Sequence, residues 1–157
     1  MISPTFQTTF VHPARIEHDE RTHTSPESVL GAFLEIDWAG LSRIACGETD
    51  EDGGLNAFYF FEARYLDASG CPHIMNISGE YTHDTDAPRL TLHYHFPERR
   101  ISRGFLGLGA PRTKFVRRWI DMERCLPEAA GAALSAFVSH DADYLNTHLY
   151  DRTFPDD

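Results

Sequence analysis

The stretch LTLHYHF (residues 90–96) alternates apolar and polar side chains along its whole length. An alternation of period two predicts a β-strand with one face toward a core and one face toward solvent. Its apolar residues mark the core face, and His93 and His95 lie side by side on the polar face. The stretch therefore predicts a half-buried sheet, and it raises the question of what the polar face contacts.

Other segments of the chain show the same strand character. Expected strands cover residues 6–11, 56–66, 73–82, 89–96 and 113–124. Turn residues separate the middle three closely. Because connections this short join neighbouring strands, we expect these strands to pair antiparallel as a meander.

The pairing of the second and third of these middle strands decides what faces the two histidines. We expect Ser78 opposite His93, Asn76 opposite His95, and Glu80 diagonal to His93. Two histidines at alternate strand positions can ligate one ion, but a zinc site needs further protein ligands. Since an H-x-H pattern alone is a weak signal, we expect no metal and no cofactor.

Helix signals precede and follow the strands. Residues 24–27 (TSPE) have capping-box spacing with an early proline, which predicts a helix start. Asp37 can cap a second short helix, so this region is one helix or a helix pair. A long C-terminal helix is expected from Pro127 onward. The charged residues 13–24 are expected to be an exposed connection, and residues 99–111 a further strand or a long glycine loop.

These elements predict one α+β domain over residues 1–157. Its single antiparallel meander sheet has about five strands, with an N-terminal helix or helix pair and a long C-terminal helix packed on one face. In the order of its elements the chain is similar to the helix-grip arrangement of lipid- and hormone-binding proteins. That similarity implies a cavity between the C-terminal helix and the sheet.

Charge is distributed unevenly along the chain. The net charge is −10, from 14 basic and 24 acidic residues. Residues 97–124 hold eight basic and three acidic residues, so this segment carries +5 and the remainder −15. The acidic total argues against a nucleic-acid partner and favours a basic protein partner. The segment 97–124 combines arginine with Phe115 and Trp119, which is typical of a protein interface.

Several classes of protein are not indicated by the sequence. The three cysteines form no CxxC pair and no disulfide framework, which favours a reduced, cytoplasmic setting. The longest apolar run, residues 57–61, is too short to span a membrane, and no secretory signal is visible. No nucleophile elbow, zinc-protease, P-loop or dinucleotide motif occurs, which argues against an enzyme.

These observations favour a non-enzymatic binding protein that acts through protein–protein contact, such as an immunity- or antitoxin-type inhibitor of a basic toxin. Acidic loop residues would steer the encounter, and aromatic and arginine side chains would anchor the complex. The predicted partner-binding residues are Glu48, Asp50, Glu51, Asp52, Phe58, Phe60, Arg117 and Trp119.

The alternative hypothesis is a small-molecule-binding or enzymatic protein with the helix-grip-like cavity. Such a cavity would lie between the C-terminal helix and the sheet and would combine apolar walls with a few polar groups. The residues predicted to line or flank it are Tyr59, Glu80, Tyr81, His93, Tyr94 and His95.

Overall fold

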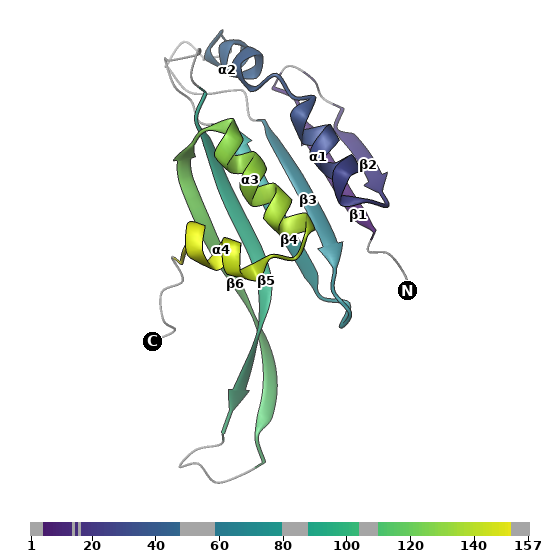
Figure 1. The fold of residues 1–157 in the computed structure, drawn as a ribbon, viewed down its shortest axis with the longest axis vertical. Coiled ribbons are helices and arrows are strands. Elements are labelled where there is room, and N and C mark those ends of the chain that lie inside the picture. Colours follow the sequence, from purple (N-terminus) through teal and green to yellow (C-terminus); the bar gives the residue numbers. More distant parts are fainter. Residues whose placement is uncertain are drawn as a thin grey trace.

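The computed structural model describes residues 5–13, 15, 17–47, 59–79, 88–103 and 110–151. The elements are β1 (Phe6–Val11), β2 (Asp19–His23), α1 (Pro26–Leu34), α2 (Trp38–Gly47), β3 (Phe60–Leu66), β4 (Pro72–Gly79), β5 (Leu90–Ser102), β6 (Arg112–Cys125), α3 (Pro127–Val138), α4 (Ala142–His148) and β7 (Tyr150–Asp151). All strands join one antiparallel sheet in the order β2-β1-β3-β4-β5-β6-β7, and α1, α3 and α4 lie over one face (Figure 1). The predicted α+β architecture is confirmed. None of the described helices is long and apolar enough to cross a membrane.

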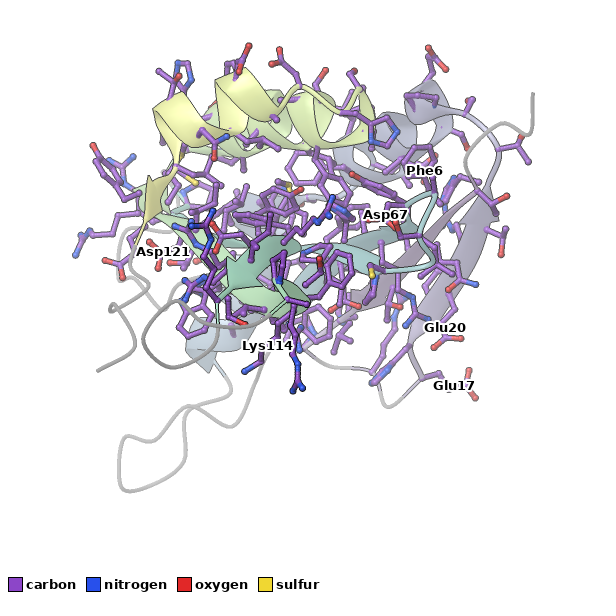
Figure 2. All side chains as sticks on the ribbon, turned by 90° about the horizontal axis from the view of Figure 1, so that it is seen from below. Phe6, Glu17, Glu20, Asp67, Lys114 and Asp121 are labelled. Atoms are coloured by element: carbon purple, nitrogen blue, oxygen red, sulfur yellow. The ribbon has the colours of Figure 1, made fainter. Side chains whose placement is uncertain are left out.

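The core lies between this helical layer and the sheet. Alternate residues of the meander strands β3 to β6 point into it, as the alternation predicted, and α3 buries a stripe of small and large apolar side chains against them. The buried residues are Tyr59, Phe61, Ala63, Tyr65, Met75, Ile77, Leu90, Leu92, Tyr94, Ile120, Ala130, Ala133, Leu134 and Phe137. No described helix covers the opposite, more polar face of the sheet (Figure 2).

The N-terminal helical region is a helix pair. The Ser25 side chain caps α1 by accepting a hydrogen bond from the Ser28 N–H at 3.3 Å, and Pro26 occupies the first turn. The Asp37 carboxylate accepts one from the Gly40 N–H at 2.9 Å just as α2 begins. The sequence did not decide between one helix and two. The second cap, at Asp37, accounts for the break between α1 and α2.

The C-terminal helical region is also divided, so the prediction of one long helix is wrong. His140 has a φ of 57°, in the left-handed region, which ends α3. The Asp141 carboxylate then accepts a hydrogen bond from the Tyr144 N–H at 3.0 Å and starts α4. Helical spacing of apolar residues continues through this break, which is why the pattern did not reveal it.

The segment predicted to be an exposed connection, residues 13–24, contains the edge strand β2. Four of its five residues are exposed, so it lacks the apolar alternation that identifies a strand. Its last residue, His23, is buried, with Nε2 2.8 Å from Thr8 Oγ1 and Nδ1 2.7 Å from Ser28 Oγ. The histidine therefore ties β1, β2 and α1 together.

Strand β5 does not end at Pro97, as the sequence predicted, but continues to Ser102. Its pairing with β4 ends at His95, while its pairing with β6 continues to Ser102. From Pro97 onward β5 therefore has a partner on one side only. A proline is tolerated there because its missing N–H can face the unpaired side.

The register between β4 and β5 differs from the expected one by two residues. Asn76, not Ser78, lies opposite His93. Ser78 lies opposite Thr91, and Ile74 takes the place expected for Asn76, opposite His95. A shift of two residues leaves every side chain on its predicted face, so the alternation could not distinguish the two registers.

Gly79 is needed where β4 ends, because the Tyr59 ring lies against its Cα. A Cβ built on Gly79 overlaps that ring, whereas one built on Gly31 of α1 meets nothing within 4 Å. We expect G79A to lower the free energy of unfolding by roughly 1–3 kcal/mol through overpacking. The control G31A should leave it unchanged or raise it by up to about 1 kcal/mol, because alanine favours a helix. Urea unfolding measures both, and equal stability of the two variants would contradict the packing.

Candidate functional site

The distal parts of β5 and β6 form a two-stranded arm, residues 96–103 and 110–118, that projects beyond the helix-covered sheet (Figure 1). Residues 96–118 contain seven basic residues and one acidic residue, a net charge of +6, which leaves −16 for the rest of the chain. The basic residues are Arg99, Arg100, Arg103, Arg112, Lys114, Arg117 and Arg118. The basic segment found in the sequence is thus concentrated on one projecting element.

The length of the arm separates its charge from that of the body. The arm extends past the last β4–β5 pair, at His95, by about 20 Å at the usual rise per strand residue. The Debye length at physiological ionic strength is about 8 Å. A partner at the outer part of the arm therefore meets a positive field that the acidic body scarcely cancels.

One side of the arm continues the helix-covered face. Some of the charged side chains on this side pair with each other. Glu98 receives hydrogen bonds from Arg118 Nη1 at 2.9 Å and from Arg100 Nε at 3.0 Å. These two bonds, that from Arg118 first, lower the pKa of Glu98 below its ordinary value. The Arg118 guanidinium also lies 5.9 Å from the centre of the Phe96 ring.

The other side of the arm continues the polar face of the sheet. Its side chains, together with Trp119 directly at the base of the arm, are called the outer face here: Arg99, Ile101, Phe115, Arg117 and Trp119. Ile101, Phe115 and Trp119 expose 62%, 53% and 41% of their surface. Arg99 and Arg117 form no ion pair with any described residue. The outer face therefore presents apolar and cationic groups together, without an acidic neighbour among them.

His93 and His95 lie at the base of this outer face. His95 faces Trp119 with ring centres 6.3 Å apart, and His93 Nδ1 lies 3.9 Å from the buried Asp121 carboxylate. Burial, followed by the charges of Arg117 and His93, lowers the pKa of His95, so its ring is neutral at neutral pH. In the described part of the chain no three His, Cys, Asp or Glu side chains are grouped to hold a metal ion.

The predicted partner-binding residues are only partly brought together. Arg117 and Trp119 both lie on the outer face. Phe60 is half-buried on β3, and β4 and β5 separate it from β6, a distance of about 14 Å at the usual strand spacing. The structure thus does not join Phe60 to the other two. Outside the described residues lie Glu48, Asp50, Glu51, Asp52 and Phe58.

The residues of the alternative, ligand-binding hypothesis are divided between two faces of the sheet. Tyr59 and Tyr94 are buried in the core, 2% and 9% exposed, on the helix-covered face. His93 and His95 lie on the opposite face, so the four do not line one cavity. The remaining members, Glu80 and Tyr81, lie outside the described residues. On its helix-covered face the sheet packs against α3 through fully buried side chains.

Sequence reasoning missed a polar chain at the end of the core. Tyr94 Oη lies 2.7 Å from His73 Nδ1, and His73 Nε2 lies 3.4 Å from Asp67 Oδ2. The Asp67 carboxylate also accepts N–H bonds from Ser69 and Cys71 in the β3–β4 turn. Counting alternate positions places His73 on the Tyr94 face, but only the true register brings the two side chains into contact.

The contacts of these polar side chains indicate a structural role, and their pKa directions agree with it. The Cys71 N–H is the main cause that lowers the pKa of Asp67, and burial lowers the pKa of His73. Burial raises the pKa of Tyr94, so its hydroxyl stays protonated and is not activated as a nucleophile. The linked side chains of Tyr94, His73 and Asp67 therefore hold the β3–β4 turn against the core.

A cavity of about 350 Å³ lies between the β1–β2 hairpin and the helix pair. Phe10, Ile36 and Leu41 contribute apolar lining, and charged groups such as Arg21 and Glu35 stand at its edge. Arg21 is held there by Asp19 at 2.7 Å and by Glu35 at 3.1 Å. This cavity is remote from the place that the helix-grip-like order implied.

Comparison of the chain with protein-family models, with curated proteins and with solved structures gives no match in any of the three.

The buried His23 and the partly buried His73 and His95 predict a loss of stability in mild acid. Burial is the first cause that lowers the pKa of His23, His73 and His95 from the ordinary 6.5. As the pH falls through 6.5 the unfolded chain takes up protons before the folded protein does, so the free energy of unfolding decreases. Urea unfolding between about pH 7.5 and 5.5 measures this slope.

The variant H73Q should make that slope shallower, because it removes one of the buried groups. The matched control H18Q alters an exposed histidine and should keep the slope of the unsubstituted protein. A free energy of unfolding that does not change over this pH range would contradict the neutral, buried state of these side chains.

Proposed function

We propose that this chain is a non-enzymatic binding protein that acts through protein–protein contact, and that the β5–β6 arm is its contact element. The observation that carries the proposal is the outer face of the arm, where exposed aromatic and aliphatic side chains alternate with two arginines. Trp, Tyr and Arg dominate the residues that anchor protein interfaces, and isolated acidic groups are rare at their centres.

The scaffold of the arm supports the same proposal. The β5–β6 pairing continues without a shift from Leu92 to Ser102, so the anchor side chains stand on a regular two-stranded ladder. Anchors that are held in place before binding lose less conformational entropy when a partner docks. The combination of exposed aromatic, aliphatic and arginine side chains on one face of this ladder matches the composition of protein interfaces.

The charge of the arm specifies the surface that it fits. A net charge of +6 on residues 96–118 favours contact with an acidic surface and accelerates the encounter at low salt. The acidic body is free to meet a basic partner elsewhere. The finer hypothesis, an inhibitor of a basic toxin steered by Glu48, Asp50, Glu51 and Asp52, stays a prediction because these residues lie outside the described part.

A small-molecule-binding function is the second candidate, and the cavity of about 350 Å³ beside α1 and α2 favours it. Its volume lies within the range of ligand sites, and it combines apolar lining with a few charged groups. Native mass spectrometry of the purified protein should then detect a bound small molecule whose mass is lost on unfolding. Recovery of the bare chain mass alone would count against this candidate.

The arm is tested by removing two of its anchors. We expect F115A/W119A to reduce the recovery of protein partners from cell lysate on the immobilised chain by about tenfold or more, because each lost anchor costs at least about 1 kcal/mol. Quantitative mass spectrometry of the captured proteins measures the change.

The matched control L34A/L66A removes two exposed leucines, 77% and 66% accessible, that lie away from the arm. It should capture the same proteins as the unsubstituted chain. Equal recovery by the arm variant and by this control would show that the arm is not the contact element.

A further inference from the structure

We infer that the arm binds a second copy of this chain, and that the outer edge of β6 in one copy pairs with the edge strand β2 of another. This inference rests on the proposed function, because it names a partner for the same arm. It follows from two open strand edges and from the charges that they carry.

Along the arm, none of the described strands pairs with the outer edge of β6. β7 pairs with β6 only at Ile120 and Asp121. From Arg112 to Trp119, β6 has β5 on one side and none of the described strands on the other. Such an edge presents a row of N–H and C=O groups that can accept a further strand.

The other open edge of the same sheet is β2. Among the described strands it pairs with β1 alone, and it ends the strand order opposite to β6 and β7. In Figure 2, Glu20 of β2 and the preceding Glu17 lie at the opposite side of the sheet from Asp121 of β6. One copy therefore cannot join its own two edges, but two copies can.

The two edges carry opposite charge. Between Arg112 and Ile120, β6 has four basic residues and no acidic one. The β2 edge carries Glu17, Asp19 and Glu20, and its one arginine, Arg21, is already held by Asp19 and by Glu35 of the same copy. Glu17 and Glu20 form no ion pair with a described residue and are exposed.

This charge pattern selects one pairing among three. Like charges directly opposite each other destabilise paired strands, so β6 beside β6 and β2 beside β2 are both disfavoured. Only β6 beside β2 brings opposite charges together. The charged edges thus prevent pairing with themselves and favour pairing with each other.

Because this pairing joins two different surfaces of the molecule, it is heterologous and does not end at a dimer. Each copy keeps one free β2 edge and one free β6 edge, so further copies can add in rings or open chains. We therefore expect association that grows with protein concentration and weakens with added salt.

Charge reversal at each edge tests the pairing. The variant K114E/R117E reverses the β6 edge, and the variant E17K/E20K reverses the β2 edge. Analytical ultracentrifugation of nuclease-treated protein at about 50 mM and about 500 mM salt measures association. We expect the unsubstituted chain to associate at low salt, each variant to sediment as a monomer, and the variant with all four substitutions to associate again.

The matched control R43E reverses an exposed arginine on α2, which belongs to neither strand edge. It should associate like the unsubstituted chain. A monomer for the unsubstituted chain at up to about 100 μM in low salt overturns the inference. So does unchanged association of K114E/R117E, or association that disappears with nuclease treatment, which would assign the arm to nucleic acid.

Failure of this inference is distinguishable from failure of the proposed function. If the chain is monomeric while F115A/W119A still loses captured proteins, the arm binds a different protein and self-pairing is wrong. If F115A/W119A captures the same proteins as L34A/L66A, the arm is not the contact element at all.

Discussion

The pairing of β5 with β6 is the interaction on which the rest of the structure depends. In its first half this ladder places Leu92 and Tyr94 beside Ile120 and so supplies one side of the core. In its second half the same ladder runs past the last residue of β4 and leaves the body of the protein. One strand pair thus belongs to two environments, because α3 packs on its inner half and no described element lies over its outer half.

The separation of charge follows from this geometry. Whole-chain charge describes an acidic protein, but the arm holds half of its basic residues and only one acid. Since the arm is longer than two Debye lengths, a partner at its outer end meets it as a separate basic element. The sequence-based expectation of a basic partner came from the acidic total and stays a prediction for the body, whereas the positive charge of the arm favours an acidic surface.

The sequence predicts the core better than it predicts the edges. Buried strands and helices carry periodic patterns, so the faces of LTLHYHF and of its neighbours were confirmed. The charged strand β2 and the two-residue strand β7 have no such pattern. Periodicity also could not give the register between β4 and β5, because a shift of two residues leaves every side chain on the same face. The candidate site was found in part: Arg117 and Trp119 were named, whereas the continuation of β5 through Pro97, which makes the arm, depends on where β4 stops.

The central claim is that the arm is where another protein chain docks, along the outer edge of β6. Hydrogen exchange of the peptide that covers residues 112–119 tests it most directly, measured at low and at high protein concentration in low salt. We expect these amides to gain protection as the concentration rises, while amides of the core, such as those of β4, do not change. Exchange at residues 112–119 that is the same at both concentrations would contradict it.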